Sequence, residues 1–179
     1  LQEIVRPTVA GMAAEGTPFR GVLYVGLMIE NGRPRVLEYN CRFGDPETQP
    51  LMMRLRSDLH GLFRATLDGR LAEADAQWDP RPALTIVAAA EGYPGSYAKG
   101  DAIPNLRAIP EGEQQRVFHA GTARRAGRVV TSGGRVLGVT ALGADLGAAR
   151  DRALAATDHL AWPRAYYRRD IGHRALGRM

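Results

Sequence analysis

The chain has 179 residues, with 24 Lys+Arg against 19 Asp+Glu, which gives a formal net charge of +5. A composition of 45% hydrophobic and 24% charged residues permits a buried core and excludes bulk disorder. No apolar run approaches the ~20 residues of a membrane span, and the single cysteine, Cys41, excludes an internal disulfide and a cysteine-based zinc site. We expect a soluble, intracellular protein of one medium domain or two small ones.

The first half of the sequence predicts a helix followed by a β-hairpin. Apolar residues near a 3.6-residue period indicate a helix over residues 1–15, kinked or ended in its first turn by Pro7. The apolar run 21–29, the turn pair Asn31-Gly32 and the returning run 33–42 predict the hairpin.

A loop and further helix are expected next. Residues 41–50 are rich in Gly, Pro, Asp and Thr and indicate a loop. Residues 51–71 read as helix in two pieces, with Ser57 or Asp58 able to cap the second. The polar, proline-containing segment 72–82 is the expected boundary between two modules.

The second half predicts short strands and one long helix. Strands are expected at residues 83–90, 116–119, 128–131 and 135–140, and a helix at residues 146–160. Gly133-Gly134 reads as a hairpin turn, or as a backbone cradle for a phosphate.

The sharpest candidate site lies on the returning strand of the hairpin. Because side chains alternate along a strand, Glu38, Asn40 and Arg42 would share one face. The opposite face would be buried and would carry Leu37, Tyr39 and Cys41. A carboxylate and an amide oxygen at this spacing can share one Mg²⁺, and a neighbouring guanidinium can hold a phosphoryl oxygen. The same spacing is also typical of a solvated polar face.

Other candidates have open readings. Asp45 and Glu47 could contact a metal, recognise an amine or position Arg42, or form an ordinary turn in which Asp45 or Thr48 caps the next helix. His119 has no second ligand at metal spacing and reads as structural. The arginine-rich tail with interleaved aromatics could bind single-stranded nucleic acid, although a solvated basic face explains it better.

The segment VLEYNCRFGDPETQP at residues 36–50 closely resembles the signature of the phosphoribosylamine–glycine ligase (glycinamide ribonucleotide synthetase) family, within the ATP-grasp superfamily of purine biosynthesis. Further segments resemble the carboxy-terminal part of that family in order: IVRPTVAGMAAEG, GVLYVGLM, LRSDL, EGYPGSY, VFHAGT, TSGGRVLGVTALG and RRDIGHRAL. The resemblance covers essentially the whole chain. Family members are about twice this length or more, so we expect a carboxy-terminal fragment that is inactive alone.

The resemblance implies an α+β fold, with residues 1–76 closing an ATP-grasp subdomain of antiparallel sheet and helices and residues 77–179 forming a small C-terminal domain. It implies ATP-dependent joining of glycine to 5-phosphoribosylamine through a glycyl phosphate. Mg²⁺ or Mn²⁺ would be bound by Glu38 and Asn40. Arg42 and Asp45 would be catalytic, and Glu47 and Arg135 would bind substrate.

The parent chain is expected to be cytoplasmic and monomeric, with no nucleic-acid or membrane partner. Two alternatives stay open at this point: another ATP-grasp carboxylate–amine ligase, and a non-catalytic Arg-rich nucleic-acid-binding module. Tight single-strand RNA binding with a steep salt dependence would favour the second.

Overall fold

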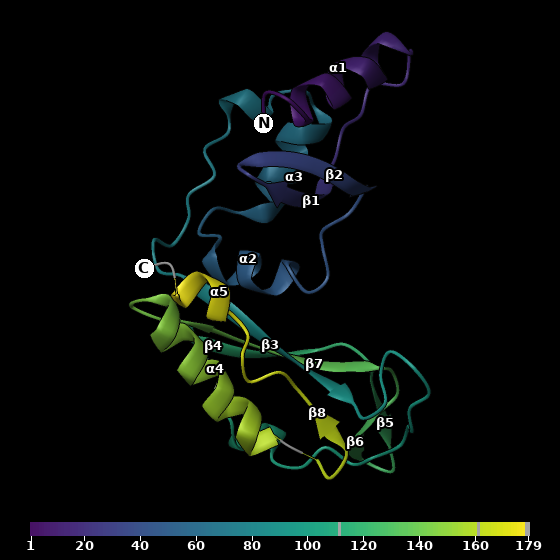
Figure 1. Ribbon diagram of the computed structural model, residues 1–179, viewed down its shortest axis with the longest axis vertical. Coiled ribbons are helices and arrows are strands. Elements are labelled where there is room, and N and C mark those ends of the chain that lie inside the picture. Colours follow the sequence, from purple (N-terminus) through teal and green to yellow (C-terminus); the bar gives the residue numbers. More distant parts are fainter. Residues whose placement is uncertain (111, 161, 178–179) are drawn as a thin grey trace. The chain divides into compact units, whose positions relative to one another are not determined.

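The computed structural model describes residues 1–110, 112–160 and 162–177, and its mixed helices and antiparallel sheets confirm the predicted α+β class (Figure 1). The chain forms two compact units, the first from Leu1–Asp45 and Arg56–Gln77, the second from Pro46–Leu55 and Trp78–Met179. This grouping differs from a single division after residue 76, because it sets residues 46–55 with the second unit. No helix within the described ranges is long and apolar enough to cross a membrane.

Helix α1 (Val5–Ala14) opens the first unit and is shorter than the helix predicted over residues 1–15. Because it begins at Val5, Pro7 falls in the first turn, where a missing N–H removes no intrahelical hydrogen bond. The helix therefore tolerates the proline without a break. Gly16 follows the C-cap residue Glu15, and its φ of 77° is the left-handed conformation that glycine adopts without strain.

The predicted hairpin is confirmed, with shorter strands. Strand β1 (Tyr24–Glu30) pairs antiparallel with β2 (Arg33–Asn40). The turn residues Asn31 and Gly32 have φ values of 51° and 76°, as a type I′ turn requires. Since β2 ends at Asn40, Arg42 lies beyond the strand on which it was expected.

The predicted buried face of β2 is wrong. Leu37 and Tyr39 are 65% and 44% exposed, and Cys41 is also exposed. The register slips by one residue opposite Gly26 and Leu27, which breaks the simple alternation that the prediction assumed. The hairpin is also a sheet of only two strands, so its own unit supplies no adjoining strands to extend the buried surface.

Helix α3 (Leu59–Leu67) confirms the second helical piece and its cap. The carboxylate of Asp58 accepts hydrogen bonds from the backbone N–H groups of His60 (3.2 Å) and Gly61 (2.8 Å). These are two of the four N–H groups that a helix start leaves without a helical partner. The short 3₁₀ helix η1 (Leu71–Glu73) then leads towards the second unit.

The second unit is built on a four-stranded antiparallel sheet. Its strands, in spatial order, are β4 (Gln115–His119), β7 (Arg135–Leu142), β3 (Ala83–Ala90) and β8 (Ala165–Tyr166). A separate hairpin joins β5 (Thr122–Arg125) and β6 (Arg128–Thr131). The helical elements of this unit are α2 (Thr48–Arg54), η2 (Leu106–Ala108), α4 (Leu146–Leu160) and α5 (His173–Leu176). The predicted β3 and α4 are confirmed with their bounds, whereas β5 and β8 were not predicted.

Helices α4 and α2 cover opposite faces of this sheet. Ile86 and Ala141 point to the face on which the small buried side chains of α4, such as Ala153, pack. On the other face, Gly138 lies opposite Gln49 of α2, because a Cβ at Gly138 would be 3.6 Å from the Gln49 side chain. Helix α2 begins at Thr48, inside the segment predicted as loop. The sheet therefore lies between two helical layers.

Asp79, which forms an ion pair with Arg81, ties α2 to the segment before β3 through its backbone groups. Asp79 is only 2% exposed and accepts hydrogen bonds from Arg81 Nε (2.9 Å), Nη2 (2.7 Å) and backbone N–H (2.9 Å). Its own backbone N–H donates to the carbonyl of Arg54 at the end of α2 (2.7 Å), and the Arg54 Nη2 donates to the Asp79 carbonyl (3.0 Å). These bonds explain why α2 groups with the second unit.

The hairpin-turn reading of Gly133-Gly134 is wrong. Strand β6 pairs with β5 and not with β7, so the two glycines join strands of different sheets. The N–H of Gly133 donates to the Gly121 carbonyl (3.1 Å), which occupies the donor that a phosphate cradle would need. A Cβ on Gly134 would meet the ring of Tyr93 at 2.1 Å. Close packing against Gly121 and the Tyr93 ring, rather than a hairpin turn, accounts for these glycines.

Candidate active site

Glu38, Asn40 and Arg42 form one chain of polar side chains at the end of β2. Asn40 Nδ2 donates to Glu38 Oε1 (3.1 Å), and Arg42 Nη2 donates to Asn40 Oδ1 (3.4 Å). The structure thus brings together the three residues that the sequence singled out, although only the first two lie on the strand.

Neighbouring residues set the positions of the two ends of this chain. Glu38 lies across the hairpin from Gly26, and a Cβ on Gly26 would come within 3.0 Å of Glu38 Cγ. At the other end, Arg42 Nη1 donates to the carbonyl of Phe43 (2.8 Å). The Phe43 ring packs against Phe63 of α3, with ring centroids 6.2 Å apart. A missing side chain in β1 and an aromatic contact with α3 therefore shape the site.

The donor set at this site suits a hard cation held jointly with phosphates. Glu38 and Asn40 supply a carboxylate and an amide oxygen, which are the oxygen ligands that Mg²⁺ and Mn²⁺ take. Within the described ranges there is no group of three or more His, Cys, Asp or Glu that could hold a metal ion. Two protein ligands leave most of an octahedron to water and phosphate oxygens, the usual arrangement for a nucleotide-bound Mg²⁺.

The two predicted carboxylates of the loop come shortly after Arg42 in the chain. Asp45 is the last residue of this stretch of the first unit, and Glu47 occupies the N-cap position of α2 in the second. The side chain of Glu47 itself makes no capping hydrogen bond to α2.

The remaining predicted residues lie in the second unit. Arg135 is the first residue of β7, is half-buried and pairs across the sheet with Ala89. His119 ends β4, and its Nδ1 shares a hydrogen bond with Thr122 Oγ1 (2.9 Å).

The sequence reasoning missed one feature outright. A pocket of about 940 Å³ is lined by residues from η2, β4, β5 and β6, including His119, Arg107 and Arg124. No local pattern marks it, because its residues converge only through the tertiary fold.

Comparison with known proteins gives the same family throughout. Residues 83–174 match the model of the phosphoribosylglycinamide synthetase C domain, and residues 1–48 match that of the phosphoribosylglycinamide synthetase ATP-grasp (A) domain. The chain is 55% identical to the phosphoribosylamine–glycine ligase of Allochromatium vinosum, over 99% of this chain and 42% of the relative. It is 52% identical to that of Pseudomonas aeruginosa, with the same two coverages.

A solved structure agrees. The crystal structure of phosphoribosylamine–glycine ligase from Thermotoga maritima superimposes with a TM-score of 0.73 at 36% identity, covering 90% of this chain and 39% of that one. The chain belongs to the phosphoribosylglycinamide synthetase family, since one family model alone spans more than half of it. It spans about 42% of the length of the curated relatives that it matches.

Proposed function

We propose that this chain is the carboxy-terminal part of an ATP-dependent ligase that joins glycine to 5-phosphoribosylamine, giving glycinamide ribonucleotide, ADP and phosphate. The observation that carries the proposal is the hydrogen-bonded chain of Glu38, Asn40 and Arg42 inside a chain that matches the A and C domains of this family in order. Relatives named phosphoribosylamine–glycine ligase at 52–55% identity support the substrates.

In this proposal Glu38 and Asn40 hold a Mg²⁺ or Mn²⁺ ion together with the phosphates of ATP. The ion, when bound, neutralises the negative charge of the phosphate oxygens. Asn40 now offers its amide N–H to Glu38 and its oxygen to Arg42. Because an amide oxygen has two lone pairs, the Asn40 oxygen could ligate the ion and still accept the bond from Arg42 (3.4 Å).

Arg42 is assigned to the phosphoryl group in transfer. Its guanidinium is anchored at one nitrogen by the carbonyl of Phe43 (2.8 Å), which holds the group in place before substrate arrives. The bonds to Phe43 and Asn40 use two of the five N–H donors of this guanidinium, so further donors could reach a phosphoryl oxygen. A fixed planar cation of this kind stabilises charge that develops as glycine carboxylate attacks the γ-phosphate.

Further assignments complete the proposal. Asp45 is proposed to be catalytic, and Glu47 and Arg135 to bind substrate. Residues 1–76 are proposed as the closing part of the ATP-grasp domain and residues 77–179 as the C-terminal domain. We further propose that the parent protein is a cytoplasmic monomer that binds neither nucleic acid nor membrane.

The test is ADP release by the full-length ligase that carries this chain, with Mg²⁺, ATP, glycine and freshly made 5-phosphoribosylamine. Turnover should require both substrates and should fall about a hundredfold or more in Glu38→Gln, which keeps the shape of the side chain but removes its charge. Glu30→Gln at the end of β1 removes the same charge from an exposed position and should leave turnover unchanged.

Each result has a distinct meaning. If Glu38→Gln keeps its turnover, the assignment of Glu38 as a metal ligand is overturned, whereas the proposed ligase activity still holds. The absence of turnover in a folded, ATP-binding full-length protein would overturn the ligase itself, and assays with other carboxylates and amines would then follow.

A further inference from the structure

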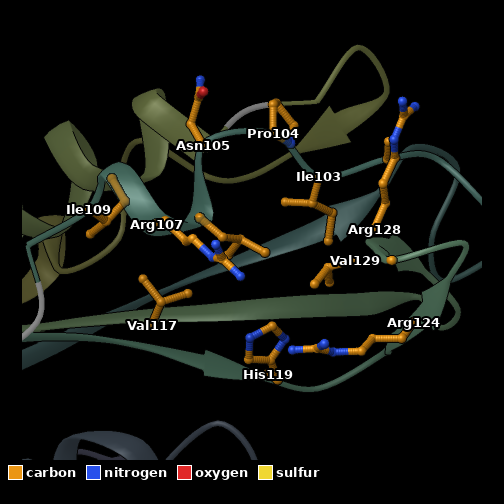
Figure 2. A pocket seen from close by; sticks show the side chains of 13 residues that line it. Ile103, Pro104, Asn105, Arg107, Ile109, Val117, His119, Arg124, Arg128 and Val129 are labelled. Atoms are coloured by element: carbon orange, nitrogen blue, oxygen red, sulfur yellow. The ribbon is translucent and has the colours of Figure 1, made fainter.

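The pocket of about 940 Å³ lies entirely within the second unit and uses none of the residues assigned above to the ligase reaction. Its walls come from the segment that contains η2, from the end of β4 and from the β5–β6 hairpin (Figure 2). A volume of this size is in the range of small-molecule sites, roughly 300–1,000 Å³.

One side of the pocket is apolar and already packed. Ile103 and Ile109 are 7% and 5% exposed and belong to the main hydrophobic core, and Val117 and Val129 pack against that core. The wall is fixed to the sheet hairpin because the N–H of Ile103 donates to the carbonyl of Val129 (2.9 Å). A flat apolar group could therefore be buried here without any rearrangement of the wall.

The other side carries cationic groups. Figure 2 shows the Arg107 side chain reaching into the pocket and the Arg124 guanidinium directed towards the ring of His119, while Arg128 extends away. No aspartate or glutamate is among the described residues that line the pocket. Two guanidinium groups and one imidazole thus face one concave space, and the two guanidinium charges concentrate positive potential there.

The two guanidinium groups are not engaged elsewhere among the described residues. Within the part of the chain that the structure describes, neither Arg107 nor Arg124 makes a side-chain hydrogen bond or an ion pair, in contrast to Arg164, which pairs with Asp101. His119 Nδ1 shares a hydrogen bond with Thr122 Oγ1 (2.9 Å), and no described residue is hydrogen-bonded to its Nε2. The donors of both guanidinium groups are therefore available to a ligand.

We propose that this pocket binds a nucleoside phosphate. Phosphate oxygens accept hydrogen bonds from Arg107, Arg124 and His119, since guanidinium groups bind phosphate in a planar, two-point fashion. The base lies against the apolar wall that Ile103, Ile109 and Val117 provide. An inorganic anion alone would leave that wall unused, and an uncharged nucleoside would leave the cations unpaired.

The proposal is tested by calorimetric titration of the 179-residue chain with ADP at about 0.15 M ionic strength, which suppresses long-range attraction. Parallel titrations use adenosine, ribose 5-phosphate and inorganic phosphate. We expect saturable ADP binding that is tighter than binding of any of the three, with a dissociation constant that rises about tenfold or more in Arg107→Ala/Arg124→Ala.

The chain offers a matched control in Arg116→Ala/Arg125→Ala. Arg116 lies on β4 and Arg125 lies on β5 next to Arg124, and both are exposed and do not line the pocket. This control removes the same net charge and should change ADP affinity less than about twofold. Glu38→Gln should also leave it unchanged, which separates the pocket from the nucleotide site of the proposed ligase reaction. Far-UV circular dichroism verifies that each variant is folded.

Several outcomes would overturn the proposal. The first is the absence of saturable ADP binding, and the second is ribose 5-phosphate or phosphate binding as tightly as ADP. The others are an equal loss of ADP affinity in both double variants, or a loss of ADP affinity in Glu38→Gln comparable to that in the pocket variant. Selective loss in Arg107→Ala/Arg124→Ala supports it whatever the outcome of the turnover assay.

Discussion

Gly26 of β1 faces Glu38 of β2 across the hairpin, and a Cβ on Gly26 would come within 3.0 Å of Glu38 Cγ. The space that lets the proposed metal ligand lie over its neighbouring strand is thus provided by the absence of a side chain. Strand β2 carries Glu38, and Gly26 of the paired strand β1 determines which positions the Glu38 side chain can occupy.

Gly26→Ala should therefore displace the Glu38 carboxylate by a few tenths of an ångström without unfolding the hairpin. We expect kcat of the full-length ligase to fall about tenfold, with a higher Mg²⁺ requirement, because small misplacements at a reacting centre are costly. Steady-state assays across a Mg²⁺ series measure this. Gly11→Ala in α1, where a Cβ meets nothing within 4 Å, is the control. Wild-type Mg²⁺ dependence in Gly26→Ala would contradict the argument.

Asp79→Ala should destabilise the second unit. The substitution removes the acceptor of three hydrogen bonds from Arg81 and leaves the Arg81 backbone N–H without that partner. We expect a loss of about 2 kcal/mol in the free energy of unfolding, measured by urea titration. Asp151→Ala removes a carboxylate that is 68% exposed, and should cost less than ~0.5 kcal/mol. Equal effects of the two variants would show that burial of Asp79 is unimportant.

Gly134→Ala should also destabilise the second unit, because the new methyl group would meet the Tyr93 ring at 2.1 Å. Overpacking of this kind costs about 1–3 kcal/mol. Tyr93→Ala should relieve most of that cost, so the double variant should be more stable than the sum of the single effects predicts. A thermal-unfolding double-mutant cycle measures the coupling. Additive effects would mean that the clash lies elsewhere.

Acid stability should depend on Asp158. Hydrogen bonds from Arg169 (2.6 and 3.0 Å) and from the Tyr167 hydroxyl lower the pKa of Asp158 below its usual value near 3.8. A carboxylate whose pKa is depressed by folding adds stability above its unfolded pKa, and this stability is lost as the pH falls through the folded pKa. Stability should therefore decline below about pH 4.

The comparison is between wild type and Arg169→Gln over pH 2.5–7. The variant should unfold roughly 2 °C lower at pH 7, and the two curves should converge in acid, where Asp158 is protonated in both. Arg150→Gln, which removes an arginine paired with an exposed aspartate, serves as the charge control. A constant difference between wild type and Arg169→Gln at all pH values would contradict the assignment.

Local chemistry was sufficient to predict several elements. Asn31-Gly32 can adopt the two positive φ values of a type I′ turn, and this fixed the hairpin. The continuous apolar run of β3 fits a strand buried on both faces, and Asp58 is a residue type that caps helices. In each case the determining interactions lie within a few residues of sequence.

The predictions that were wrong depend on contacts between residues far apart in sequence, or on the exact register of strand pairing. The bulge opposite Gly26 and Leu27 undid the predicted burial of Leu37, and no composition rule reports a bulge. Strand β5 reads TARR, which lacks the apolar alternation of a strand, and is held by pairing with β6. Arg42 was expected on the strand, but a backbone carbonyl beyond the strand end orients it. The prediction that it lies beside Asn40 was nevertheless correct.

The position of α2 has a consequence for dissecting this protein. Because α2 precedes residues 56–77 of the first unit but packs on β3 and β7 of the second, the polypeptide passes between the units three times. A fragment that starts at residue 78 would keep every strand of the four-stranded sheet and yet expose the face around Thr85 and Gly138 that Gln49 now covers. A single proteolytic cut after residue 77 would leave α2 still packed on that sheet. Neither truncation nor limited digestion at this point would yield two independent halves.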